Sequence, residues 1–111
     1  MGPKLEEFEK KFAEYIGTKY AVAVNSGTSG LHLLIRSMDI GKGDEVITVC
    51  NTFYATVGAT VACGAKPVLI DCDSRYQIDH KKIISKITKK TKVIMPVHWG
   101  GASPQMNEII K

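Results

Sequence analysis

The chain alternates between two hydrophobic patterns. Some segments carry apolar residues three and four positions apart with charged residues between them, which is the spacing of an amphipathic helix. Others are short continuous apolar runs bounded by glycine or polar residues, which is typical of a buried strand. The helical pattern covers residues 4–16, 28–39, 52–63, the segment after Asp79 and the segment after Pro104. The strand pattern covers residues 20–24, 45–49, 67–70 and 92–97.

These elements follow one another along the whole chain, and the strands are apolar throughout rather than at every second residue. Such strands are typical of a parallel sheet covered by helices on both faces. The sequence therefore predicts an α/β fold with three layers (α/β/α) and a mostly parallel sheet. A length of 111 residues provides one domain at most. Because the first helix begins at once and the last does not complete its apolar face, we expect residues 1–111 to be a partial domain, truncated at both ends.

Composition and charge narrow the class of protein. Apolar residues make up 44% of the chain and charged residues 23%, which is ordinary for a soluble globular protein. The net charge of +4 comes mainly from residues 80–92. Because no nucleic-acid-binding motif accompanies these basic residues, they are predicted to form a solvated helix face rather than a nucleic-acid patch. No apolar run is long enough to cross a bilayer, and the N-terminus does not have the pattern of a signal peptide.

The three cysteines, Cys50, Cys63 and Cys72, are widely spaced. This spacing fits neither a disulfide framework nor a zinc site. The simplest interpretation is a protein of a reducing compartment, the cytoplasm, without a bound metal.

The clearest candidate site is the motif of residues 25–30, Asn-Ser-Gly-Thr-Ser-Gly, where a predicted strand meets a predicted helix. In parallel sheets ligands bind beyond the carboxyl ends of the strands. A helix N-terminus there offers unpaired N–H groups and the positive end of the helix dipole. Gly27 lets the backbone approach a ligand, and Thr28 and Ser29 add hydroxyl donors. The motif therefore indicates a phosphate site, although serine and threonine are also ordinary helix caps.

Polar or aromatic residues follow the other three predicted strands as well. Asn51-Thr52-Phe53-Tyr54 could supply a ring on which a planar ligand stacks, or a core aromatic at a helix start. Asp71-Cys72-Asp73 brings two carboxylates together, but a capping or turn role is favoured because no further ligands stand at useful spacing. His98-Trp99 contains a possible acid or base, although a lone histidine is more often structural. The clustering at successive strand ends is better evidence for a site than any one motif.

Several segments, including the two motifs above, match the sequence motifs of one protein family, in the same order and along nearly the whole chain. They are Gly2-Pro3-Lys4 with Phe8–Phe12, Ala21–Ser29, Gly43–Ile47, Asn51–Phe53 with Ala55-Thr56, Gly64–Val68 with Asp71, and Pro96–His98 with Gly100. Together they resemble the sugar aminotransferases of the DegT type, although each is weak alone.

This resemblance implies a fold, a cofactor and a reaction. The fold would be the large domain of fold-type I pyridoxal-phosphate enzymes. Gly27, Thr28 and Ser29 match the family's phosphate cup, and Phe53 matches the aromatic residue that stacks on the pyridine ring. The reaction would be amino transfer, usually from glutamate, to a keto-sugar carried on a nucleoside diphosphate, in the biosynthesis of cell-surface or secondary-metabolite sugars. The family works as a homodimer with active sites at the subunit interface.

The chain also departs from the family pattern. Gly30 stands where alanine is usual, and Val49 replaces a common proline. The family's aspartate that pairs with the pyridine nitrogen lies beyond residue 111, and so does the lysine that binds the cofactor covalently. We therefore assign no catalytic residue and expect the chain alone to be inactive. The resemblance also implies that the strand of residues 20–24 is separated from the other three by strands that come later, which would leave its edges exposed.

Two other interpretations remain open from the sequence. The chain could be a truncated, non-catalytic module that binds a phosphorylated ligand or a partner through the same cup. It could also be a flavodoxin-like regulatory domain, but the first predicted strand ends in Asn25-Ser26 and lacks the carboxylates that such domains need.

Overall fold

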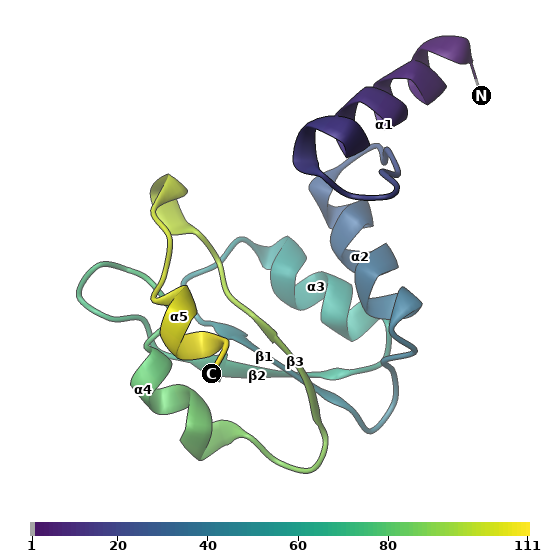
Figure 1. The fold of residues 1–111 in the computed structure, drawn as a ribbon. Coiled ribbons are helices and arrows are strands. Elements are labelled where there is room, and N and C mark those ends of the chain that lie inside the picture. Colours follow the sequence, from purple (N-terminus) through teal and green to yellow (C-terminus); the bar gives the residue numbers. More distant parts are fainter. Residues whose placement is uncertain (1) are drawn as a thin grey trace.

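The computed structural model describes residues 2–111 (Figure 1). Its helices are α1 (Pro3–Ile16), α2 (Gly27–Ser37), α3 (Tyr54–Ala62), α4 (His80–Ile83) and α5 (Met106–Ile109), and two short 3₁₀ turns are η1 (Ile84–Lys86) and η2 (Trp99–Gly101). Its strands are β1 (Glu45–Val49), β2 (Lys66–Ile70) and β3 (Thr91–Met95). Seven of the elements predicted from the pattern are therefore present close to their expected bounds, and the helix after Pro104 begins two residues later than the proline.

The three strands form one parallel sheet in the order β2-β1-β3. Val46 of β1 stands beside Pro67 of β2 on one side and Val93 of β3 on the other. All five residues of β1 are buried, as expected for a central strand with helices on both faces. The hydroxyl of Thr48 donates a hydrogen bond of 2.8 Å to the carbonyl of Met95, which ties the centre of the sheet to the end of β3. The predicted parallel α/β architecture is confirmed.

Alternate residues of β1 supply two separate hydrophobic cores. Val46 packs with Ala59 of α3, which covers this face of the sheet, and with Ile35 of α2, which packs against α3 (Figure 1). Ile47 lies on the opposite face, where it packs in the same cluster as Ile83 of α4. Burying one such side chain contributes about 1.5–3 kcal/mol. The sheet is therefore the middle layer of a three-layer arrangement.

One predicted element is absent. Residues 20–24 form no strand within residues 2–111, and the segment is exposed, with Tyr20 73% and Val22 77% accessible. A buried strand needs partners on its edges and helices on its faces, and the sheet of β1, β2 and β3 does not reach this segment. The backbone N–H of Ala23 instead donates to the carboxylate of Glu9 in α1, at 2.7 Å. The prediction of a buried strand is thus wrong for this structure.

The same end of the molecule exposes other apolar side chains. Phe8 and Phe12 of α1 stack on each other with ring centroids 5.6 Å apart, yet both remain largely accessible. Together with residues 20–24 and the outer side of α2, they line two shallow apolar hollows. Nowhere in residues 2–111 is a helix long and apolar enough to cross a bilayer.

Candidate functional site

The N-terminus of α2 is built by a serine cap. Ser26 has an extended backbone, and its hydroxyl oxygen accepts a hydrogen bond of 3.2 Å from the N–H of Ser29. The carbonyl of Ser26 accepts the N–H of Gly30 at 3.1 Å. Within residues 2–111 the N–H groups of Gly27 and Thr28 have no acceptor. Two donors therefore remain at the positive end of a helix of 11 residues, which is the arrangement that binds anions.

The two hydroxyl groups of the motif are not equivalent. Ser29 donates a short hydrogen bond of 2.6 Å to the side-chain oxygen of Asn25, and its oxygen lies 3.1 Å from that of Ser26. Thr28 makes no side-chain hydrogen bond in the part of the chain that the structure describes. Thr28 thus presents a free hydroxyl, whereas Ser29 holds the loop before the helix together and must give up Asn25 to donate to a ligand.

Three of the four predicted binding residues line one hollow. The hollow has a volume of about 460 Å³ and lies between the starts of α2 and α3. It is lined by Gly27, Thr28, Leu31, Phe53, Ala55 and Thr56. A Cβ built on Gly27 would meet no atom within 4 Å, so there is open space beside this residue. Ser29 is the one predicted residue that does not line it.

The aromatic pair at the start of α3 divides into two roles. Phe53 is the residue before the helix, has an extended backbone and is 77% exposed. Tyr54 is almost as exposed, but its ring lies over Gly58 of its own helix, where a Cβ would come within 2.9 Å of Tyr54 Cε1. Phe53 is therefore the ring of the pair that lines the hollow and is available to a planar ligand.

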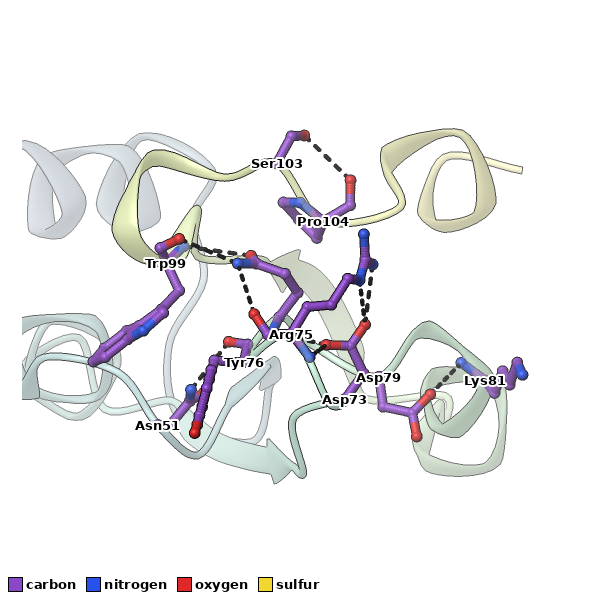
Figure 2. A network of polar contacts seen from close by, with 10 residues as sticks. Asn51, Asp73, Arg75, Tyr76, Asp79, Lys81, Trp99, Ser103 and Pro104 are labelled. Carbon is purple, nitrogen blue, oxygen red and sulfur yellow. Dashed lines mark hydrogen bonds and ion pairs between the residues drawn. The ribbon is translucent and has the colours of Figure 1, made fainter.

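The carboxylates after β2 organise the loop rather than form an acid–base pair. Asp73 accepts the N–H groups of Arg75 at 2.8 Å and Gln77 at 3.1 Å, and it forms an ion pair with the Arg75 guanidinium (Figure 2). Partial burial opposes its ionisation, but these hydrogen bonds outweigh the burial and lower the pKa of Asp73. Asp71 instead pairs with Lys82 at 2.9 Å, and this hydrogen bond lowers the pKa of Asp71. The predicted turn and capping role is confirmed for Asp73.

The predicted histidine and tryptophan after β3 lie in an exposed turn. His98 is exposed, and its carbonyl accepts the N–H of Gly101 at 3.0 Å. Gly100 and Gly101 both have a positive φ, which lets the chain turn back over so few residues. The side chain of Trp99 is 46% exposed. His98 is not brought to the hollow between α2 and α3, so the structure gives it no contact with the phosphate motif.

Two polar side chains at this edge of the sheet make contacts that the sequence patterns did not predict. Asn51 donates to the carbonyl of Tyr76 at 3.0 Å, and Gln77 bonds the main chain of Trp99 (Figure 2). Both amides tie together loops that lie far apart in the chain. No local spacing marks such contacts, because the partner residues lie in loops that follow other strands.

Comparison with known proteins identifies relatives over the whole chain. Residues 1–111 match the model of the DegT/DnrJ/EryC1/StrS aminotransferase family. The chain is 48% identical over 110 residues to the dTDP-3-amino-3,6-dideoxy-alpha-D-galactopyranose transaminase of Aneurinibacillus thermoaerophilus, and this covers 98% of the chain and 30% of that protein. It is 46% identical over 112 residues to the GDP-perosamine synthase of Caulobacter vibrioides, covering all of the chain and 30% of that protein.

Solved structures give the same result for the fold. Spr1654 of Streptococcus pneumoniae in its PLP form superposes with a TM-score of 0.95 at 34% identity, covering 99% of this chain and 28% of that one. The chain thus spans somewhat less than a third of the length of the relatives that it matches.

Proposed function

Because the chain belongs to the DegT/DnrJ/EryC1/StrS aminotransferase family, we propose that it is the cofactor-binding part of a nucleotide-sugar aminotransferase that uses pyridoxal 5′-phosphate. The observation that carries this proposal is the shared hollow, in which a phosphate-type helix N-terminus and a free aromatic ring face the same space. Relatives named for GDP- and dTDP-linked sugars support the substrate class.

The residues present fit this cofactor. The free N–H groups of Gly27 and Thr28, with the hydroxyl of Thr28, would hold its phosphate, and the dipole of α2 would favour the negative charge. Gly27 has no side chain to obstruct the phosphate, and a Cβ there would enter open space. Phe53 would cover one face of the ring and keep water from it. When bound, the cofactor would serve as the electron sink for amino transfer.

Several features of the complete reaction would come from outside this chain. None of its lysines matches the family's cofactor-binding lysine, so residues 1–111 alone would not catalyse amino transfer. Glutamate is the proposed amino donor, and a homodimer is the proposed assembly, both from the family pattern. The free thiols of Cys50, Cys63 and Cys72 support a cytoplasmic location, because an oxidising compartment would favour their oxidation.

The aromatic pair provides a matched test of the cofactor site. In the full-length protein, Phe53→Leu should weaken binding of pyridoxal 5′-phosphate roughly 2- to 13-fold, the range expected for losing one aromatic stacking contact. Tyr54→Leu removes an equally exposed ring that lies along its own helix and should leave the affinity unchanged. Cofactor absorbance during titration gives both values. Equal affinities in the two variants would refute the assignment of Phe53.

A further inference from the structure

Gln77 is a polar side chain that is 1% exposed, in the loop between β2 and α4. Both ends of its amide are used. Its Nε2 donates to the carbonyl of Trp99 at 3.2 Å and to that of Arg75 at 3.4 Å, and its Oε1 accepts the N–H of Trp99 at 3.3 Å. A buried amide that satisfies all its partners fixes their geometry, because breaking any bond leaves a buried polar group unpaired.

The contact with Trp99 imitates one step of a β-ladder. A side-chain amide carries the same donor and acceptor as a peptide group, and here it bonds both the N–H and the carbonyl of one residue. The main chain of Gln77 is held in turn, because it exchanges hydrogen bonds with Asp73: its carbonyl accepts the Asp73 N–H at 2.7 Å, and its N–H donates to the carboxylate at 3.1 Å. The turn that contains Trp99 is thus anchored to a rigid loop.

Asn51 makes a similar connection one strand away. Its Nδ2 donates to the carbonyl of Tyr76 at 3.0 Å, and this bond fixes the orientation of the amide because a carbonyl can only accept. Its Oδ1 is buried and has no donor within residues 2–111. Two side-chain amides therefore connect the loops after β1, β2 and β3 at the carboxyl edge of the sheet. Phe53 belongs to the first of these loops.

We propose that Gln77 is a positioning residue that holds Trp99 as one wall of the substrate site; the substrate part of this inference rests on the function proposed above. Trp99 lies in the loop after β3, at the same carboxyl edge of the parallel sheet as Phe53, and ligands bind beyond this edge. It is outside the residues that line the 460 Å³ hollow, which leaves its ring free for a part of the ligand other than the phosphate. The indole of Trp99 is about half exposed, and its main chain is already ordered by the two hydrogen bonds to the Gln77 amide, which we call the clasp. A large ring on an ordered backbone loses little conformational entropy when a ligand covers it.

The clasp itself can be tested by fluorescence, because Trp99 is the single tryptophan of the chain. Gln77→Met keeps the size of the side chain and removes its three hydrogen bonds. It should shift the Trp99 emission to longer wavelength and increase quenching by acrylamide. Gln77→Glu keeps the acceptor for the Trp99 N–H but cannot donate while ionised. A buried carboxyl has a raised pKa, so its emission should return toward that of the unchanged protein as the pH falls from 8 to 5.

The matched control is Gln105→Glu, which makes the same chemical change at an exposed glutamine and should leave the emission unaltered. Unaltered emission in both Gln77 variants would overturn the clasp. This measurement needs neither cofactor nor substrate, so its failure is distinguishable from failure of the proposed function.

The positioning role is tested in the protein from the complete coding frame. Gln77→Met should raise the KM for a dTDP- or GDP-linked keto-sugar about fivefold, the equivalent of one net hydrogen bond of about 1 kcal/mol, with little change in kcat or in the affinity for pyridoxal 5′-phosphate. An unchanged KM, or an equal loss of cofactor affinity, would overturn the role in substrate binding. If the unchanged protein binds no cofactor, the proposed function fails, whereas the fluorescence result still decides the clasp.

Discussion

Replacing Gly27 with alanine should change ligand binding without lowering the stability of the fold. Gly27 is the first residue of α2, and an added Cβ would meet no atom within 4 Å. The folded protein should therefore accept alanine without strain. Alanine also favours a helix over glycine by up to about 1 kcal/mol, so the melting temperature should stay the same or rise by up to roughly 4 °C.

Cofactor binding should respond in the opposite direction. Gly27 lines the hollow where the phosphate is proposed to bind, so an added methyl group should compete with the phosphate for this space and displace it from at least one backbone N–H. A hydrogen bond to a charged group is worth about 1.5–3 kcal/mol, so the affinity for pyridoxal 5′-phosphate should fall roughly 12- to 150-fold. Thermal denaturation and titration of the protein from the complete coding frame measure the two effects.

Gly30→Ala is the matched control. It makes the same change in the same helix, but its Cβ would meet Val24 Cγ2 at 3.6 Å, an ordinary contact, and Gly30 does not line the hollow. This variant should gain stability and keep its affinity. If Gly27→Ala also keeps its affinity, the N-terminus of α2 does not hold the phosphate and the central observation behind the proposed function is lost.

Two further predictions concern the chain on its own. A hydrogen bond of 2.7 Å from the Thr88 hydroxyl lowers the pKa of Glu45, so this pair stabilises the fold above the ordinary glutamate pKa of about 4.3 and ceases to do so as the pH falls through the lowered value. In urea unfolding, Thr88→Val should therefore lose less stability than the unchanged protein between pH 6 and pH 3, whereas Thr88→Ser, which keeps the hydroxyl, should lose as much. An equal dependence of stability on pH in the two variants would contradict the assignment. The exposed residues 20–24 should make the 111-residue chain self-associate as its concentration rises. In sedimentation velocity, Val22→Lys should reduce this association, whereas Ile84→Lys, at an equally exposed site near α4, should not. A monodisperse monomer that unfolds cooperatively would show the reasoning to be wrong.

Elements whose stability depends on nearby sequence were predicted well. Residues 45–49 were assigned as a strand with the bounds that the structure shows, because polar and glycine residues end the apolar run on both sides. The helix at residues 3–16 follows from its own periodicity and from Gly17, whose positive φ ends it. The run at residues 20–24 has an equally clear pattern but forms no strand, because strand formation also needs a partner. Pattern alone does not reveal whether that partner is present.

The candidate site also contains features that depend on nearby sequence and features that depend on distant partners. The phosphate motif was visible because a glycine and hydroxyl residues at a helix start make a local signal. The orientation of the Ser29 hydroxyl toward Asn25 could not be predicted, because in the folded loop this hydroxyl lies near two acceptors, the oxygens of the Asn25 and Ser26 side chains. Gln77 gave no signal at all, since its role exists only when the turn after β3 lies beside the loop after β2.

The central position of β1 has a consequence for how the chain folds during synthesis. Thr48 of β1 must wait for Met95, which is 47 residues later in the chain, before its hydroxyl finds a partner. At a ribosomal rate of about 5–20 residues per second, this interval is roughly 2–9 s. The β1–β2 unit emerges first, and one edge of β1, a strand that is fully buried in the finished fold, stays open in the meantime. A chaperone that binds extended apolar segments would therefore have its longest opportunity on this chain before β3 leaves the ribosome.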